Sequence, residues 1–75
     1  MMQGHTYILL HPERKKPHVP LEVIEYDDHG NPFCFYKAYW TPWRGWKLYP
    51  AFCRGIMNKS DKVKTVAEAA VRPKQ

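Results

Sequence analysis

Proline recurs at positions 12, 17, 20, 32, 42 and 50, and this spacing constrains the first two-thirds of the chain more than any other feature. A proline inside a helix removes a backbone hydrogen bond, and its ring clashes with the preceding turn. The apolar residues between the prolines are dominated by Val, Ile, Tyr and Phe, which favour strands. We therefore expect residues 1–57 to form a mostly β structure of short strands joined by turns.

Four segments have the length and composition of strands: residues 7–10, 21–26, 33–40 and 46 to about 53. The first is a continuous apolar run, which is consistent with a strand buried on both faces. The second alternates, so that Leu21 and Val23 share one face. Residues 27–32 (DDHGNP) predict a hairpin turn, because Asp, Asn and Gly accept left-handed backbone conformations. Pro50 cannot donate to a ladder, which marks an edge or a bulge in the fourth strand.

The last segment changes period. Val63, Val66, Ala67, Ala70 and Val71 recur at helical spacing, which predicts a short amphipathic helix within residues 58–75, ended by the final proline. The expected fold class is thus α+β: one small domain with a twisted antiparallel sheet of three or four strands over residues 1–57, and a C-terminal helix and basic tail over 58–75. An SH3-like small barrel is the alternative.

The length of 75 residues allows one core and leaves little room for an enclosed pocket. The apolar run at residues 7–10 is too short for a signal sequence or a membrane span, so we expect a cytoplasmic protein that does not enter a membrane. In that reducing compartment, Cys34 and Cys53 are expected to be free thiols rather than a disulfide. The sequence leaves open whether the protein is a monomer or a homodimer.

Positive charge is concentrated in the second half of the chain. Residues 1–32 carry three basic and five acidic side chains, whereas residues 33–75 carry nine basic and two acidic ones. Such an asymmetry favours a negatively charged partner, either nucleic acid or an acidic protein surface. Charge that serves only solubility is the alternative.

Aromatic residues are concentrated in the same half, where nine of the twenty residues from 33 to 52 are Phe, Tyr or Trp. A small sheet cannot hide so many rings, so several are expected on the surface beside basic residues. Rings that fill the core are the alternative for the cluster as a whole. The predicted binding surface consists of Lys37, Tyr39, Trp40, Trp43, Arg44, Trp46, Lys47 and Arg54.

Chemistry other than binding finds little support in the pattern. Three tryptophans spaced W-x2-W-x2-W resemble a cage for a methylated ammonium, but such a cage normally needs an acidic companion, and the only carboxylates near in sequence are Asp27 and Asp28. The four histidines and two cysteines lack the spacing of zinc ligands, and no nucleophile or phosphate-loop motif is present. We therefore expect no enzyme activity, no catalytic residue, no metal and no cofactor.

The leading hypothesis is a non-catalytic binder of nucleic acid, or of the machinery that handles it, because stacked rings beside cations suit single strands. The alternative is an inhibitor that docks on an acidic host protein through the same surface, or through an exposed edge strand at residues 7–10. A short, basic, aromatic-rich chain of this kind resembles the small accessory proteins of bacteriophages and mobile elements. That resemblance, which rests on no specific residues, implies a host target such as RNA polymerase or a defence nuclease. Self-association through exposed rings is a third possibility.

Overall fold

The fold is nearly all β. A computed structural model describes residues 4–54 and 63–74 of the chain. In chain order its elements are β1 (Thr6–Leu9), η1 (Pro12–Arg14), β2 (Leu21–Tyr26), β3 (Pro32–Thr41), β4 (Gly45–Cys53), β5 (Lys64–Val66), η3 (Glu68–Ala70) and β6 (Val71–Pro73), where η denotes a short 3₁₀ helix. Each of the four strands expected in the first 57 residues is present. No helix in the described part is long and apolar enough to cross a membrane.

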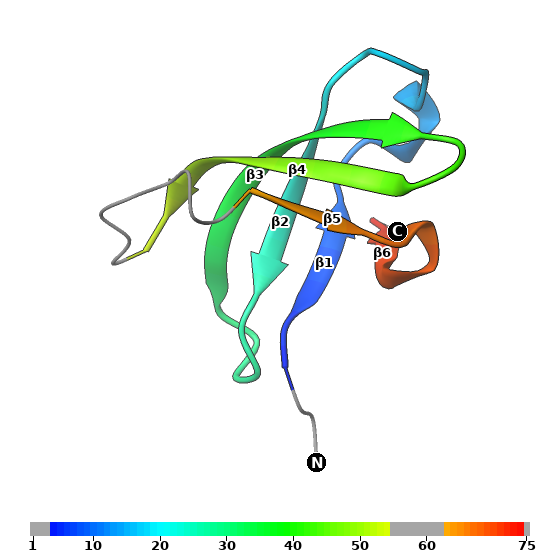
Figure 1. Ribbon diagram of the computed structural model, residues 1–75. Coiled ribbons are helices and arrows are strands. Elements are labelled where there is room, and N and C mark those ends of the chain that lie inside the picture. Colours follow the sequence, from blue (N-terminus) through cyan, green and yellow to red (C-terminus); the bar gives the residue numbers. More distant parts are fainter. Residues whose placement is uncertain (1–3, 55–62, 75) are drawn as a thin grey trace.

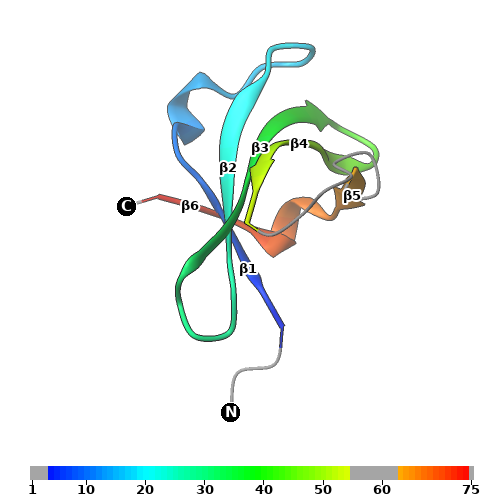
Figure 2. The same cartoon turned by 90° about the vertical axis from the view of Figure 1, so that its left-hand side faces the viewer.

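All six strands belong to one sheet, in the order β5-β4-β3-β2-β1-β6 (Figure 1). Neighbouring strands are antiparallel, except that β6 runs parallel to β1. Seen from the side, the sheet curls into a half-barrel (Figure 2). It does not close among the described residues, because β5 and β6 form its two edges. The expected α+β fold with three or four strands is therefore wrong, and the sheet is not a closed small barrel either.

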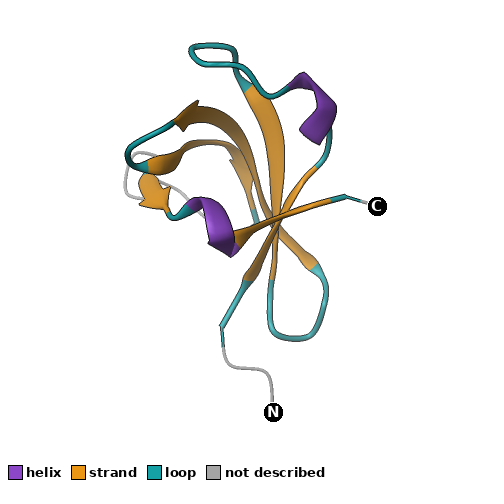
Figure 3. Ribbon diagram, turned by 90° about the vertical axis from the view of Figure 1, so that its right-hand side faces the viewer, coloured by secondary structure: helices purple, strands orange, loops and turns teal. Residues whose placement is uncertain are grey.

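The predicted C-terminal helix is wrong where the structure describes that segment. Lys64–Val66 pairs with β4, and Val71–Pro73 pairs with β1. Only the single 3₁₀ turn η3 lies between them (Figure 3). The apolar stripe consists of valine and alanine, and burying these small side chains on one helix face stabilises a helix only slightly. β-branched residues such as valine favour strands and suit a sheet edge. Residues 58–62 of the predicted helix lie outside the described residues.

β1 is an inner strand, which corrects two expectations. It lies between β2 and β6, so residues 7–10 offer no free edge for a partner. The strand is also not buried on both faces: Leu9 points into the core, but Ile8 is only half-buried on the opposite face. The apolar run at this strand therefore leaves part of its surface outside the core.

The concave face of the half-barrel holds the core. Val23, Tyr36, Ala38 and Leu48 are almost fully buried there, as the alternation of β2, β3 and β4 dictates. Trp46, with 1% of its surface exposed, is the largest side chain in this core. The opposite, convex face of the sheet is called the outer face below.

Cys34 and Cys53 form a disulfide in this core, so the expectation of two free thiols is wrong. The two residues are cross-strand partners on β3 and β4, which brings their side chains together on the same face. Their separation of 19 residues is bridged by a hairpin. The sequence contained no signal for that pairing, because the register of the two strands was unknown.

A polar cluster on the concave side joins strands that are distant in the sheet. The buried Glu25 carboxylate on β2 accepts a hydrogen bond from the Tyr36 hydroxyl at 2.5 Å and also contacts His5. Burial, and then the hydrogen bond to Glu25, raises the pKa of Tyr36. Lys64 on β5 lies 3.8 Å from Glu25 and donates to the Tyr7 hydroxyl on β1 at 3.0 Å. These contacts link β5 to β1 and β2 where no strand pairing does.

Candidate functional site

The outer face of β3 and β4 carries exposed rings and lysines side by side. Along β3 the residues alternate, with Cys34, Tyr36 and Ala38 in the core and their neighbours outside. Along β4, Trp46 and Leu48 point inward and the intervening residues point outward. The outward residues of this hairpin form a surface that we call the basic aromatic platform: Phe35, Lys37, Tyr39, Lys47, Tyr49 and Phe52.

Strand register brings the platform residues into cross-strand pairs. Phe35 is paired with Phe52, Lys37 with Tyr49, and Tyr39 with Lys47. A shift of register between Phe35 and Tyr36 accommodates the extra residue on β4 near Pro50, which confirms the bulge expected there. Pro50 also lies beyond the last residue of β4 that pairs with β5, so its missing N–H leaves no gap in that ladder.

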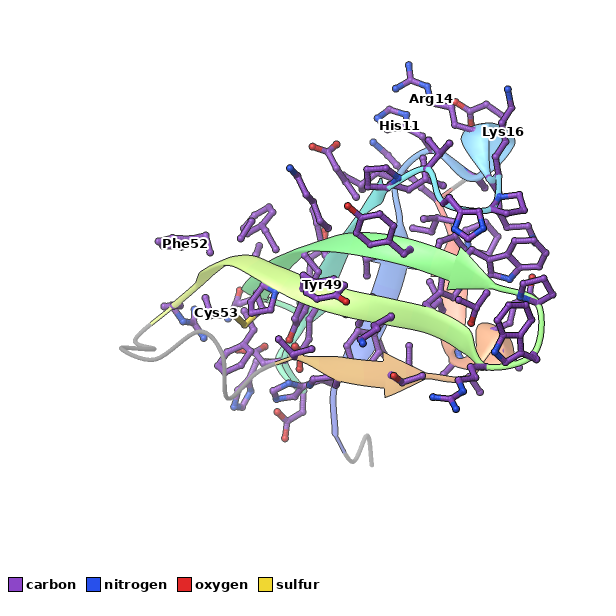
Figure 4. The ribbon with its side chains drawn as sticks, turned by 45° about the horizontal axis from the view of Figure 1, so that its top comes forward. His11, Arg14, Lys16, Tyr49, Phe52 and Cys53 are labelled. Carbon is purple, nitrogen blue, oxygen red and sulfur yellow. A yellow bond between two sulfur atoms is a disulfide. The ribbon has the colours of Figure 1, made fainter. Side chains whose placement is uncertain are left out.

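The rings of the platform are held by contacts with one another rather than by burial. Tyr39 and Tyr49 meet edge to face, with centroids 5.6 Å apart, and the Phe35 and Phe52 centroids are 6.4 Å apart. Phe35 and Tyr49 expose about two-fifths of their surface, and Phe52 exposes 60%. Figure 4 shows Tyr49 over the outward side of β4 and Phe52 near the end of that strand. Such exposed rings are typical of a contact surface.

Both platform lysines are available to a ligand. The Lys47 ammonium lies 5.5 Å from the centroid of the Tyr49 ring, a weak cation–π contact at an exposed site. No carboxylate of the described residues lies within 4 Å of the Lys37 or Lys47 ammonium group. The positive charge of these two side chains is therefore not neutralised by ion pairs in the part of the chain that is described.

Two hollows lie next to each other on the outer face. A shallow one of about 280 Å³ is lined by Lys37, Tyr39 and Tyr49. A larger groove of about 650 Å³ runs between the β2–β3 surface and the loop that contains η1. Lys37 lines both, so the two hollows meet at this side chain. His11 and Arg14 belong to the loop side of the groove, and Figure 4 shows them beyond β3 from Tyr49.

The structure distributes the predicted surface over several parts of the fold, and only part of it lies on the platform. Lys37, Tyr39 and Lys47 lie there. Trp43, with 75% of its surface exposed, and Arg44 lie together at the turn between β3 and β4.

The remaining three predicted residues lie away from both the platform and the β3–β4 turn. Trp46 is buried in the core, so its assignment to a binding surface is wrong; the alternation of β4 turns it inward. Trp40 is half-buried, and the Lys15 ammonium lies 4.5 Å from its ring centroid. Arg54 is exposed, but it pairs with Asp27 at 3.0 Å in the β2–β3 turn region. The three indoles therefore do not converge into a cage.

Lys15 also ties the η1 loop to the C-terminal segment. Its ammonium lies 2.6 Å from the Glu68 carboxylate on η3, and it lowers the pKa of that carboxyl. The same ammonium lies over the Trp40 ring, so one face of this indole is already covered by a side chain of the protein. Trp40 lies apart from the platform because the alternation of β3 turns it to the side of Tyr36 and Ala38, where it packs against the core.

Sequence reasoning assigned no role in binding to Phe35, Tyr49 and Phe52, which are the most exposed rings of the platform. The signal that identifies two of them is the alternation of each strand: Phe35 shares a face with Lys37, and Tyr49 shares one with Lys47. Strict alternation would place Phe52 on the inner face, but the bulge before it reverses the alternation and turns it outward. The clustering of aromatic residues drew attention to the tryptophans instead.

Comparisons with known proteins give no relative for this arrangement: no family model, no curated protein and no solved structure matches the chain.

Proposed function

We propose that this protein is a non-catalytic module that binds single-stranded nucleic acid through the basic aromatic platform. The observation that carries the proposal is the row of cross-strand pairs that sets exposed rings beside unpaired lysines on one face of the β3–β4 hairpin. Bases stack on such rings whatever their sequence, and lysines neutralise the phosphates between them.

The two hollows support the same proposal because they provide space for neighbouring bases. Tyr39 and Tyr49 line the shallow hollow, and Phe35 lines the groove. Lys37 lies between them and lines both. A strand that placed one base in each hollow would therefore keep its backbone close to a cation, which reduces the repulsion between successive phosphates.

The test is binding of a fluorescent oligonucleotide of about 12 nucleotides to the protein and to three variants. Tyr49→Ala and Phe52→Ala are each expected to weaken binding by about 1–3 kcal/mol, which is the usual value of one base stacked on an aromatic side chain. Tyr49→Phe is the matched control, because it keeps the ring and removes only the hydroxyl. It is expected to bind like the unmodified protein.

Folding of each variant is checked by circular dichroism, since the substituted side chains lie outside the core. The proposal is abandoned if micromolar protein does not retain the oligonucleotide at low salt. It is also abandoned if Tyr49→Ala binds as well as Tyr49→Phe, because stacking then contributes nothing.

A second candidate is docking on a host protein, and one further observation favours it. The apolar residues Ile8, Ile24, Phe35 and Phe52 are successive cross-strand partners on the outer face of β1 to β4. Such a row resembles the apolar centre of a protein interface. This candidate is preferred if Ile24→Ser abolishes capture of a cellular protein that survives nuclease treatment, while oligonucleotide binding is absent.

A further inference from the structure

A carboxylate in the larger groove is out of place on a surface that binds phosphates. Glu22 lies on the outer face of β2, exposed, and is the cross-strand partner of Lys37 on the platform. It is the only acidic side chain lining either of the two hollows described above. A carboxylate accepts hydrogen bonds but donates none and repels phosphate. A ligand group that donates hydrogen bonds would therefore suit this carboxylate better than a phosphate.

Donors flank Glu22 on both sides. Lys37 is its neighbour on β3, and the His11 Nε2 atom in the η1 loop lies 3.9 Å from Glu22 Oε1. The walls on either side are apolar and come from Leu10 and Val19 of the loop region and Phe35 of the platform. Arg14 of the loop is a further donor in the lining. The groove thus combines apolar walls with one carboxylate among donors, and its volume of about 650 Å³ lies in the range of small-ligand sites, about 300–1,000 Å³.

Among the four bases, guanine alone has two adjacent donors, N1–H and N2–H, beside an acceptor, O6, on its Watson–Crick edge. A carboxylate accepts both donors at once, as it does from arginine, and a neighbouring cation donates to O6. Adenine, cytosine and uracil or thymine each have a single donor group on that edge. Unpaired bases are the ones whose Watson–Crick edges are open to such readout.

We propose that the groove selects an unpaired guanine, with Glu22 accepting from N1–H and N2–H and with Lys37 or His11 donating to O6. This inference rests on the proposed function, since the groove continues the platform through Phe35 and Lys37. It adds base specificity to a surface that otherwise binds without regard to sequence.

The experiment compares oligothymidylates of about 12 nucleotides in which one central base is thymine, guanine, inosine or 7-deazaguanine, together with the matching RNA series. One guanine is expected to tighten binding about five- to a hundredfold over thymine. Inosine lacks the N2 amine and is expected to lose most of that gain. The 7-deazaguanine base keeps the Watson–Crick edge and is expected to retain the gain.

Glu22→Gln is expected to reduce the preference for guanine to less than about twofold, because its amide group offers only one acceptor oxygen. Glu13→Gln is the matched control. It removes the same charge, and Glu13 also contacts His11, at 3.7 Å, but it does not line the groove. It is expected to leave the preference intact, so that a general change of charge is distinguished from loss of the acceptor.

The outcomes separate this inference from the function on which it rests. If every oligonucleotide binds alike, if inosine binds like guanine, or if Glu22→Gln and Glu13→Gln behave alike, guanine readout is wrong while platform binding stands. If no oligonucleotide binds at all, the platform proposal is wrong and the inference falls with it. A guanine preference in only one of the DNA and RNA series assigns the readout to that nucleic acid.

Discussion

At the scale of single residues, Asp27 shows how one carboxylate fixes the turn between β2 and β3. Its Oδ1 atom accepts hydrogen bonds from the backbone N–H groups of Asn31 and His29, at 2.9 and 3.0 Å, and its Oδ2 atom pairs with Arg54. The Asn31 N–H above all, with Arg54 and His29, lowers the pKa of Asp27 from its ordinary value of 3.8. The folded state therefore favours the charged form of this side chain.

The sign of the pH dependence follows from that shift. A group whose pKa is lowered by folding stabilises the protein above its unfolded pKa, and this contribution is lost as the pH falls through the folded value. Asp27→Asn keeps an oxygen that accepts from the turn but removes the charge. We expect the variant to melt at a lower temperature than the parent at neutral pH, with the difference shrinking below about pH 4.

Thermal unfolding followed by circular dichroism at a series of pH values measures this difference. A melting difference that stays constant from neutral to acidic pH would show that the charge of Asp27 contributes nothing to the turn.

At the scale of elements, substitution of Gly45 tests whether the C-terminal segment lies against the β3–β4 turn. It has a φ of +88°, and a Cβ atom there would lie 2.4 Å from the Val66 carbonyl oxygen of β5 and 2.8 Å from the Glu68 amide nitrogen of η3. Gly45→Ala is expected to destabilise the fold both through its φ, by about 1–2 kcal/mol, and through this clash, by about 1–3 kcal/mol more.

Gly30→Ala supplies the matched control for Gly45→Ala. Gly30 has a φ of +83° but nothing within 4 Å of a Cβ atom, so its substitution causes only the conformational strain. Urea unfolding of both variants gives the difference in free energy of unfolding. Equal losses for the two variants would contradict the pairing of β5 with β4, and would be expected if the C-terminal segment were a helix away from this turn.

The strands could be predicted from the sequence, because apolar runs, alternation and a composition that favours strands are all local signals. The predicted segment 21–26 has the bounds of β2, and the expected turn connects it to β3 through residues 27–31, with Pro32 as the first residue of β3. The C-terminal segment was misread because its pairing depends on β4 and β1, which are distant in sequence, and no local pattern reveals such partners. For the same reason the bond between Cys34 and Cys53 could not be foreseen.

The candidate site was predictable only in part, for a related reason. Alternation shows that Trp46 and Tyr49 lie on opposite faces of β4, but it does not show which face is the concave one. That choice depends on how the whole sheet curls, and it sends Trp46 into the core and Tyr49 outside. Lys37, Tyr39 and Lys47 were identified because basic and aromatic residues are interleaved in this part of the sequence, and the curl of the sheet places all three on its outer face.

At the scale of the whole molecule, the separation of charge along the chain does not become a separation in space. β2, from the acidic half, lies between β1 and β3, so that Glu22 stands beside Lys37 from the basic half. On the proposed function, the net charge of +5 would attract a polyanion from a distance, whereas the platform lysines would determine where it is held. The two contributions respond differently to salt.

The salt dependence of binding measures the second contribution. Each phosphate contact on a single strand adds about −0.7 to the slope of the logarithm of the binding constant against the logarithm of the salt concentration. Contacts by Lys37 and Lys47 therefore predict a slope of about −1.4 or steeper. Lys47→Gln is expected to make the slope shallower by about 0.7. Lys74→Gln removes the same charge next to β6, at the opposite edge of the sheet from β5, and is expected to leave the slope unchanged.

Equal effects of the two substitutions on the slope would mean that only the overall charge attracts the nucleic acid strand. A binding constant of the parent protein that does not change with salt would favour an apolar protein interface over nucleic acid.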